Sequence, residues 1–91
     1  MGSEVDVATV QIYTTNYCPY CTRAKALLAR KGVRFEEIDV TNDPELREKM
    51  VRLAGGRRTV PEIFVDGKLV GGYDELKELD DSGELDALLA G

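Results

Sequence analysis

The sequence contains no histidine, no tryptophan and only two cysteines among its 91 residues. The absence of histidine excludes a Ser-His-Asp triad, a histidine general base and a histidine-ligated zinc site. Two cysteines are too few for a tetrahedral site made of four thiolates from one chain. They lie together as Cys18-Pro19-Tyr20-Cys21, so a bond between them closes no long loop. This spacing favours redox chemistry in a reducing compartment, the cytoplasm, over a structural disulfide.

Long apolar runs are also missing. No stretch approaches the roughly 18 residues that a bilayer span needs, and no apolar segment follows the N-terminus. We therefore expect neither a membrane protein nor a secreted one. The net charge of −5 argues against a nucleic-acid partner, because such proteins are usually basic.

The charges are distributed unevenly along the chain. Residues 22–58 hold ten of the twelve Lys and Arg residues, whereas residues 71–91 hold seven acids and one Lys. Two interpretations stay open. The basic stretch could bind a small anionic ligand while the acidic stretch meets cationic partners, or both could be ordinary solvated surface.

The length predicts one domain spanning residues 1–91, with residues 1–5 flexible. Hydrophobic periodicity predicts strands at 7–14, 33–40, 62–65 and 68–70. Helices are expected at 19–31, from Pro44 to Gly55-Gly56, after an Asp74 N-cap, and after Ser82-Gly83. Leu46, Met50 and Leu53 are predicted to form the buried face of the second helix.

This order, β-α-β-α-β-β-α with a further short helix, predicts an α/β fold. The first strand-helix-strand unit gives a parallel pair through a right-handed crossover, and the final hairpin adds an antiparallel pair. Helices must then cover both faces of a four-stranded mixed sheet. A Cys-x-x-Cys motif where the first strand meets the first helix is typical of the thioredoxin fold.

Cys18 is predicted at the N-cap of the first helix, where free N–H groups and the helix dipole favour a thiolate. Thiols in such positions have pKa values of about 3.5–7.5, against about 8.5 for a free thiol. Cys21 lies one turn further along, close enough to form a disulfide, and is the candidate resolving thiol. Tyr20 could border the sulfur or be an ordinary exposed aromatic residue, and the sequence leaves both possibilities open.

Two later segments are further candidates for the site. Thr59-Val60-Pro61 could carry a cis bond before Pro61, in which case the backbone of Val60 could pair with an extended peptide. Gly71-Gly72-Tyr73-Asp74-Glu75 combines glycines with a helix start whose N–H groups could hold a carboxylate. A strand-end turn followed by an N-cap would explain the same residues.

Taken together, these segments resemble the dithiol glutaredoxins from Val7 to about Leu89. The resemblance implies a thioredoxin fold, no permanently bound cofactor, and a monomer that uses glutathione to reduce glutathionylated proteins and protein disulfides. It assigns Cys18 as the nucleophile and Cys21 as the resolving thiol. The implied glutathione-binding residues are Tyr20, Arg57, Thr59, Val60, Pro61, Gly72, Tyr73, Asp74 and Glu75.

Two positions depart from the family pattern. Many relatives carry a Lys shortly before the first Cys, where this chain has Thr15 and Asn16. The second Asp common after the glycines is Glu75 here. Either change could alter glutathione affinity, and Arg57 or Arg58 could compensate.

Binding of an iron–sulfur cluster is an alternative function of a different class. In a cluster-binding module, two chains would each supply Cys18, and two glutathione molecules would complete a four-thiolate [2Fe–2S] shell. The Pro-Tyr pair between the cysteines disfavours this alternative, because cluster-binding relatives more often have Gly or Ser before the tyrosine.

Overall fold

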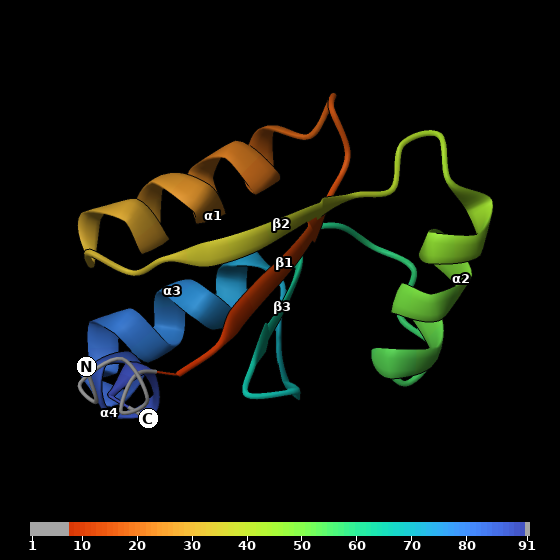
Figure 1. Cartoon of the computed structure of the whole chain (residues 1–91). Coiled ribbons are helices and arrows are strands. Elements are labelled where there is room, and N and C mark those ends of the chain that lie inside the picture. The colour runs from red at the N-terminus through yellow and green to blue at the C-terminus, as the bar shows by residue number, and fades with distance from the viewer. Residues whose placement is uncertain (1–7, 91) are drawn as a thin grey trace, which may run out of the picture.

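The structure, a computed structural model, describes residues 8–90. The expected flexibility of residues 1–5 and the expected strand start at residue 7 lie outside this range. The predicted order of elements is confirmed (Figure 1). The elements are β1 (Val10–Thr14), α1 (Pro19–Arg30), β2 (Phe35–Asp39), α2 (Pro44–Leu53), β3 (Glu62–Val65), β4 (Lys68–Gly71), α3 (Tyr73–Ser82) and α4 (Glu84–Leu89).

The four strands form one mixed sheet in the order β2-β1-β3-β4. β1 pairs with β2 in parallel, and it pairs with β3 antiparallel with Ile12 opposite Ile63. β3 and β4 form the expected hairpin around Asp66 and Gly67, whose φ angles of 51° and 80° suit a tight two-residue turn. The predicted α/β fold class is therefore confirmed.

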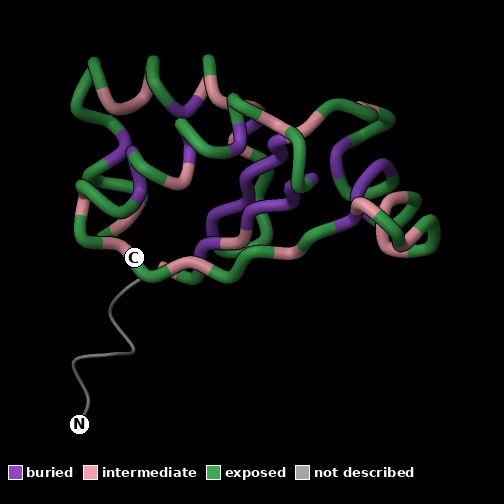
Figure 2. Tube along the Cα trace, turned by 90° about the horizontal axis from the view of Figure 1, so that it is seen from above, coloured by how far each residue is buried: buried purple, intermediate pink, exposed green. Residues whose placement is uncertain are grey.

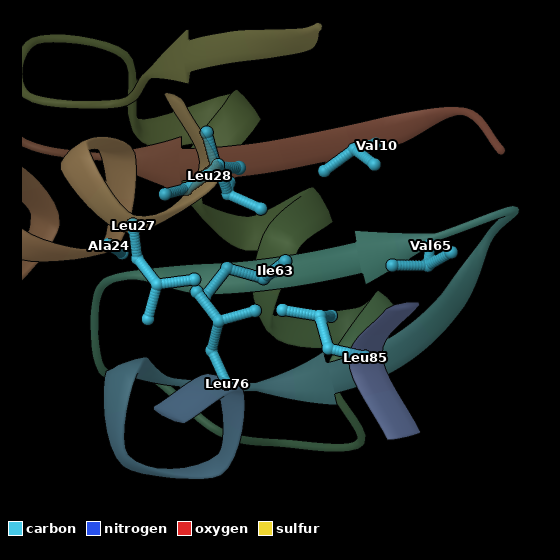
Figure 3. Packing of buried hydrophobic residues seen from close by; sticks show 9 residues of the cluster. Val10, Ala24, Leu27, Leu28, Ile63, Val65, Leu76 and Leu85 are labelled. Carbon is cyan, nitrogen blue, oxygen red and sulfur yellow. The ribbon is translucent and has the colours of Figure 1, made fainter. Parts of the chain in front are cut away.

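Helices cover both faces of this sheet, as Figure 1 shows, with α2 on one side and α1 and α3 on the other. The larger cluster joins α1, α3 and α4 to one sheet face, and Leu27, Ile63 and Leu76 are almost fully buried in it (Figure 3). The smaller cluster packs Met50 of α2 against Tyr13 and Phe64 on the opposite face. Each fully buried side chain of this size contributes roughly 1.5–3 kcal/mol, so the two clusters hold the helices to the sheet.

Local signals fix the ends of the first two helices. Cys18 is the N-cap of α1 with Pro19 at the first helical position, and Gly32 follows the helix with a φ of 73°. Asp43 caps α2 by accepting a hydrogen bond from the Leu46 N–H at 3.0 Å. These caps place the start of α1 directly after the carboxyl end of β1.

Two predictions about the helices are wrong. Leu53 is not buried but 51% exposed, because Met50, Val51 and Ala54 fill the contact with the sheet and Leu53 lies at the margin of that stripe. The N-cap of α3 is Gly72, not Asp74. Glu75, three residues on, accepts a hydrogen bond from the Gly72 N–H at 2.8 Å, which stabilises the earlier start.

Buried positions concentrate on the two central strands and on the inner sides of the helices (Figure 2). Within residues 8–90, no helix has the length and apolar character needed to cross a membrane.

Candidate active site

The two cysteines occupy the first turn of α1, where β1 delivers the chain to the helix. They form a disulfide, with their Cα atoms 5.2 Å apart. The Cys21 N–H donates a hydrogen bond to the Cys18 sulfur at 3.0 Å. Cys18 is partly exposed, whereas Cys21 is only 1% exposed. The geometry therefore places a helix N–H against the accessible sulfur and keeps the second cysteine in the core.

Tyr20, between the cysteines, is both exposed and part of the site. It is 52% exposed, yet its ring lies 6.2 Å from that of Tyr73 at the start of α3. The Arg23 guanidinium lies over the same ring, 5.1 Å from its centroid. Tyr20 is therefore the exposed aromatic residue that the second possibility describes, and its ring also lines the pocket described next.

A pocket of about 280 Å³ lies next to the first turn of α1, and the carbonyl oxygen of Val60, one of its lining residues, is 3.7 Å from the Cys18 sulfur. It is bordered by the start of α1, the loop before β3 and the start of α3. Its lining consists of the nine residues named as a glutathione site by the resemblance: Tyr20, Arg57, Thr59, Val60, Pro61, Gly72, Tyr73, Asp74 and Glu75. Three segments far apart in the sequence therefore meet at one place.

The loop before β3 forms the wall nearest the cysteines. The Val60–Pro61 bond is cis, and the Val60 carbonyl oxygen lies 3.7 Å from the Cys18 sulfur. A ligand that lies along the Val60 backbone would have its own atoms next to that sulfur. The wall therefore brings the Val60 backbone next to Cys18.

The opposite wall is the turn from β4 into α3. Gly71 has a φ of +122°, and a Cβ there would lie 2.9 Å from a Glu75 carboxylate oxygen. A Cβ on Gly72 would lie 3.4 Å from the Pro61 carbonyl oxygen, so the two walls approach closely. The hydrogen bond from the Gly72 N–H is the main cause that lowers the pKa of Glu75 below its usual value.

Arg57 is the cation of the pocket. Its Nη2 lies 3.6 Å from Glu75 Oε1 and its Nε lies 3.3 Å from Glu62 Oε2. The neighbouring Arg58 pairs with Glu48 at 2.7 Å and does not line the pocket. Arg57 is therefore the one cation among the residues that line this pocket.

The two positions that replace the family's upstream Lys have other surroundings. Thr15 is 5% exposed, and its hydroxyl has no hydrogen-bond partner among the described residues. The Asn16 N–H donates to the Thr41 hydroxyl at 2.9 Å, which ties the loop before Cys18 to the loop after β2. Neither residue lines the pocket.

Sequence reasoning missed one residue of this region. Glu62, the first residue of β3, is fully buried, and its Oε2 accepts a hydrogen bond from the Thr59 hydroxyl at 3.0 Å. Burial raises the pKa of this carboxyl above its usual value. The only available signal was a charged residue directly after Pro61 at the start of an otherwise apolar strand.

Comparison with models of known protein families gives a match over most of the chain. The glutaredoxin family model matches residues 10–70. Glutaredoxin 3 of Escherichia coli K12 is 51% identical over 83 residues, which cover 91% of this chain and 99% of that protein. A probable glutaredoxin of Synechocystis is 49% identical over 82 residues, covering 90% and 93% of the two chains.

Solved structures agree with this match. The solution structure of a glutaredoxin from Brucella melitensis is 53% identical with a TM-score of 0.83, covering 93% of this chain and 91% of that one. A buckwheat glutaredoxin–glutathione complex is 30% identical with a TM-score of 0.81, covering 93% and 79%. The chain has the thioredoxin fold of these proteins. With its cysteine pair at Cys18 and Cys21, the chain belongs to the glutaredoxin family.

Proposed function

We propose that this chain is a glutathione-dependent thiol–disulfide oxidoreductase that reduces glutathionylated proteins and protein disulfides. The observation that carries the proposal is the pocket beside Cys18, which gathers a cation, a backbone edge and a helix start. Its volume of about 280 Å³ suits a small ligand better than a folded partner. The buckwheat relative, which has been solved as a complex with glutathione, supports the choice of ligand.

We assign each charged or hydrogen-bonding group of glutathione to one part of the pocket. Arg57 would bind the glycyl carboxylate, and the Val60 backbone would pair with the cysteinyl residue beside Cys18. The first-turn N–H groups of a helix lack partners within the helix, so the start of α3 would hold the γ-glutamyl carboxylate. Asp74, which is exposed there, would pair with the ammonium group.

The reaction consists of two thiol–disulfide exchanges. The Cys18 thiolate attacks the glutathione sulfur of a mixed disulfide, forming a Cys18–glutathione disulfide and releasing the target as a thiolate. A second glutathione thiolate then attacks the glutathione sulfur of that adduct. Oxidised glutathione leaves and the Cys18 thiolate is regenerated, so two glutathione-derived electrons reduce one disulfide bond.

Cys21 serves the second substrate class. When Cys18 is joined to a target protein by a disulfide, the Cys21 thiolate attacks the Cys18 sulfur and releases the target's second thiolate. The resulting Cys18–Cys21 disulfide is the form seen in the structure. Glutathione then reduces it in two exchanges.

The proposal is tested by coupling the protein to glutathione and glutathione reductase with a small glutathionylated disulfide as substrate. A parallel assay supplies thioredoxin reductase instead. We expect turnover only in the first assay, and turnover only in the second would contradict the proposal. The absorbance spectrum of protein purified without oxygen tests the alternative, since a visible cluster band would favour the cluster-binding module.

The remaining expectations belong to the same proposal. We propose that the protein acts as a monomer in the cytoplasm and without a resident cofactor, glutathione being a substrate. Support comes from the closely spaced cysteine pair, which suits a reducing compartment. Sedimentation of the reduced protein at assay concentration measures the oligomeric state.

A further inference from the structure

Glu62 is an unusual residue for the interior of this protein. Its side chain is fully buried at the start of β3, immediately after Pro61 of the pocket wall. One carboxyl oxygen, Oε2, meets both the Thr59 hydroxyl at 3.0 Å and Arg57 Nε at 3.3 Å. The other, Oε1, has no hydrogen-bond partner among residues 8–90. A buried carboxyl with an unsatisfied oxygen costs stability, so its presence calls for a physical reason.

The contacts of Arg57 suggest that reason. Its guanidinium is bracketed by Glu62 on Nε and by Glu75 on Nη2 at 3.6 Å. These two nitrogens form one edge of the planar group. Nη1 takes part in no ion pair among residues 8–90, so the adjacent edge that it makes with the outer N–H of Nη2 remains available to a ligand carboxylate in bidentate geometry.

The two carboxylates differ in how firmly they can hold the arginine. The Glu75 side chain is 45% exposed, and exposed ion pairs are weak and mobile. The Glu62 side chain is enclosed and is further fixed by the Thr59 hydroxyl. Because Glu62 cannot swing into solvent, it defines where the half-exposed Arg57 comes to rest before a ligand arrives.

We propose that Glu62 is a positioning residue for glutathione: its buried carboxyl fixes the Arg57 guanidinium so that the free edge faces the glycyl carboxylate. This inference rests on the proposed function. It assigns a role to a residue that does not line the pocket, and it acts on affinity through Arg57 rather than on the chemistry at Cys18.

Two substitutions separate positioning from packing. Glu62→Leu removes both contacts, whereas Glu62→Gln keeps an oxygen that can accept from Thr59 and lie next to Arg57 Nε. Replacing a buried charge by a hydrophobic residue of similar volume is often neutral or stabilising, so Glu62→Leu is expected to fold. Glu62→Met, with an unbranched and adaptable side chain, serves the same purpose if leucine does not pack.

Steady-state reduction of a glutathionylated peptide is measured against glutathione concentration. Glu62→Leu should raise the glutathione KM roughly three- to tenfold with kcat nearly unchanged, the pattern of lost uniform binding. Glu62→Gln should stay within about twofold of the unaltered protein. The double variant Arg57→Ala/Glu62→Leu should have the KM of Arg57→Ala alone, because the two residues act as one unit.

Three results would overturn the proposal. One is a Glu62→Leu KM equal to that of the unaltered protein while Arg57→Ala raises it. Another is independent, multiplicative effects in the double variant. The third is an unchanged KM in Arg57→Ala, which would leave no arginine contact to position. Failure of the proposed function is a separate result, since the unaltered protein itself would then show no turnover with glutathione.

Discussion

The unequal exposure of the two cysteines predicts that they can be separated by substrate. Cys18 is partly exposed and Cys21 is 1% exposed, so an external disulfide reaches only Cys18. Cys21→Ser keeps the backbone N–H that donates to the Cys18 sulfur at 3.0 Å, and the nucleophile stays supported. Glutathionylated substrates should then be reduced at close to the full rate, because free glutathione can discharge the Cys18 adduct.

Protein disulfides should respond very differently. The Cα atoms of the pair are 5.2 Å apart, within the range that lets two cysteines bond without moving the backbone. Well-oriented intramolecular groups reach effective concentrations of about 10⁵–10⁸ M. Even about 1 M would favour Cys21 over about 1 mM glutathione by roughly a thousandfold. Cys21→Ser should therefore slow protein-disulfide reduction by at least about a hundredfold.

The assay compares Cys21→Ser and Cys18→Ser on a glutathionylated peptide and on a protein with an intramolecular disulfide. Cys18→Ser should lose both activities. The reasoning is refuted if Cys21→Ser abolishes deglutathionylation, or if Cys18→Ser retains it. Equal loss of both activities in Cys21→Ser would likewise show that the buried cysteine is not merely the resolving thiol.

Three further predictions follow from the site and the sheet. In Cys21→Ser, the Cys18 alkylation rate plotted against pH should have its midpoint below the free-thiol value of about 8.5, and a midpoint at that value would contradict an activated thiolate. Arg57→Ala should raise the glutathione KM more than it lowers kcat; Arg58→Ala, whose side chain pairs with Glu48 away from the pocket, is the matched control and should change neither. Hydrogen bonds from Lys25 and then from the Thr14 hydroxyl lower the pKa of Glu37. Its contribution to the free energy of unfolding is therefore present above its unfolded pKa of about 4.3 and is lost as the pH falls through the folded value. The difference in unfolding midpoint between Glu37→Gln and the unaltered protein should thus shrink on acidification, and a difference independent of pH would be evidence against this contribution.

Much of the fold and the site follows from local sequence signals. Three of these signals act through local backbone geometry: Pro19 at a helix start, Gly32 after the helix end and Asp66-Gly67 in a two-residue turn. Apolar periodicity then gives the element order. The site residues gather because the carboxyl end of β1, the loop before β3 and the turn after β4 meet at one end of the sheet.

What the sequence did not reveal depends on side-chain contacts that hydrophobic periodicity does not show. Leu53 continues the helical period, but only the packing of α2 against the sheet shows that Val51 and Ala54 already fill that contact. Asp74 is as suitable for a first turn as for an N-cap, and the reach of Glu75 back to Gly72 decides between them. Glu62 is buried although it is charged, and its ion pair with Arg57, five positions earlier in the loop before β3, is visible only in the structure.

The strand order has a consequence for how this protein meets other chains. β2 and β4 are the sheet's outer strands, and unpaired strand edges are templates for intermolecular pairing and aggregation. β2 carries Glu36, Glu37 and Asp39 within five residues, so a second copy aligned along it would meet like charges. β4 is only four residues long and ends at Gly71, whose φ of +122° breaks the extended backbone. Both outer strands thus discourage strand addition by a second copy of the chain.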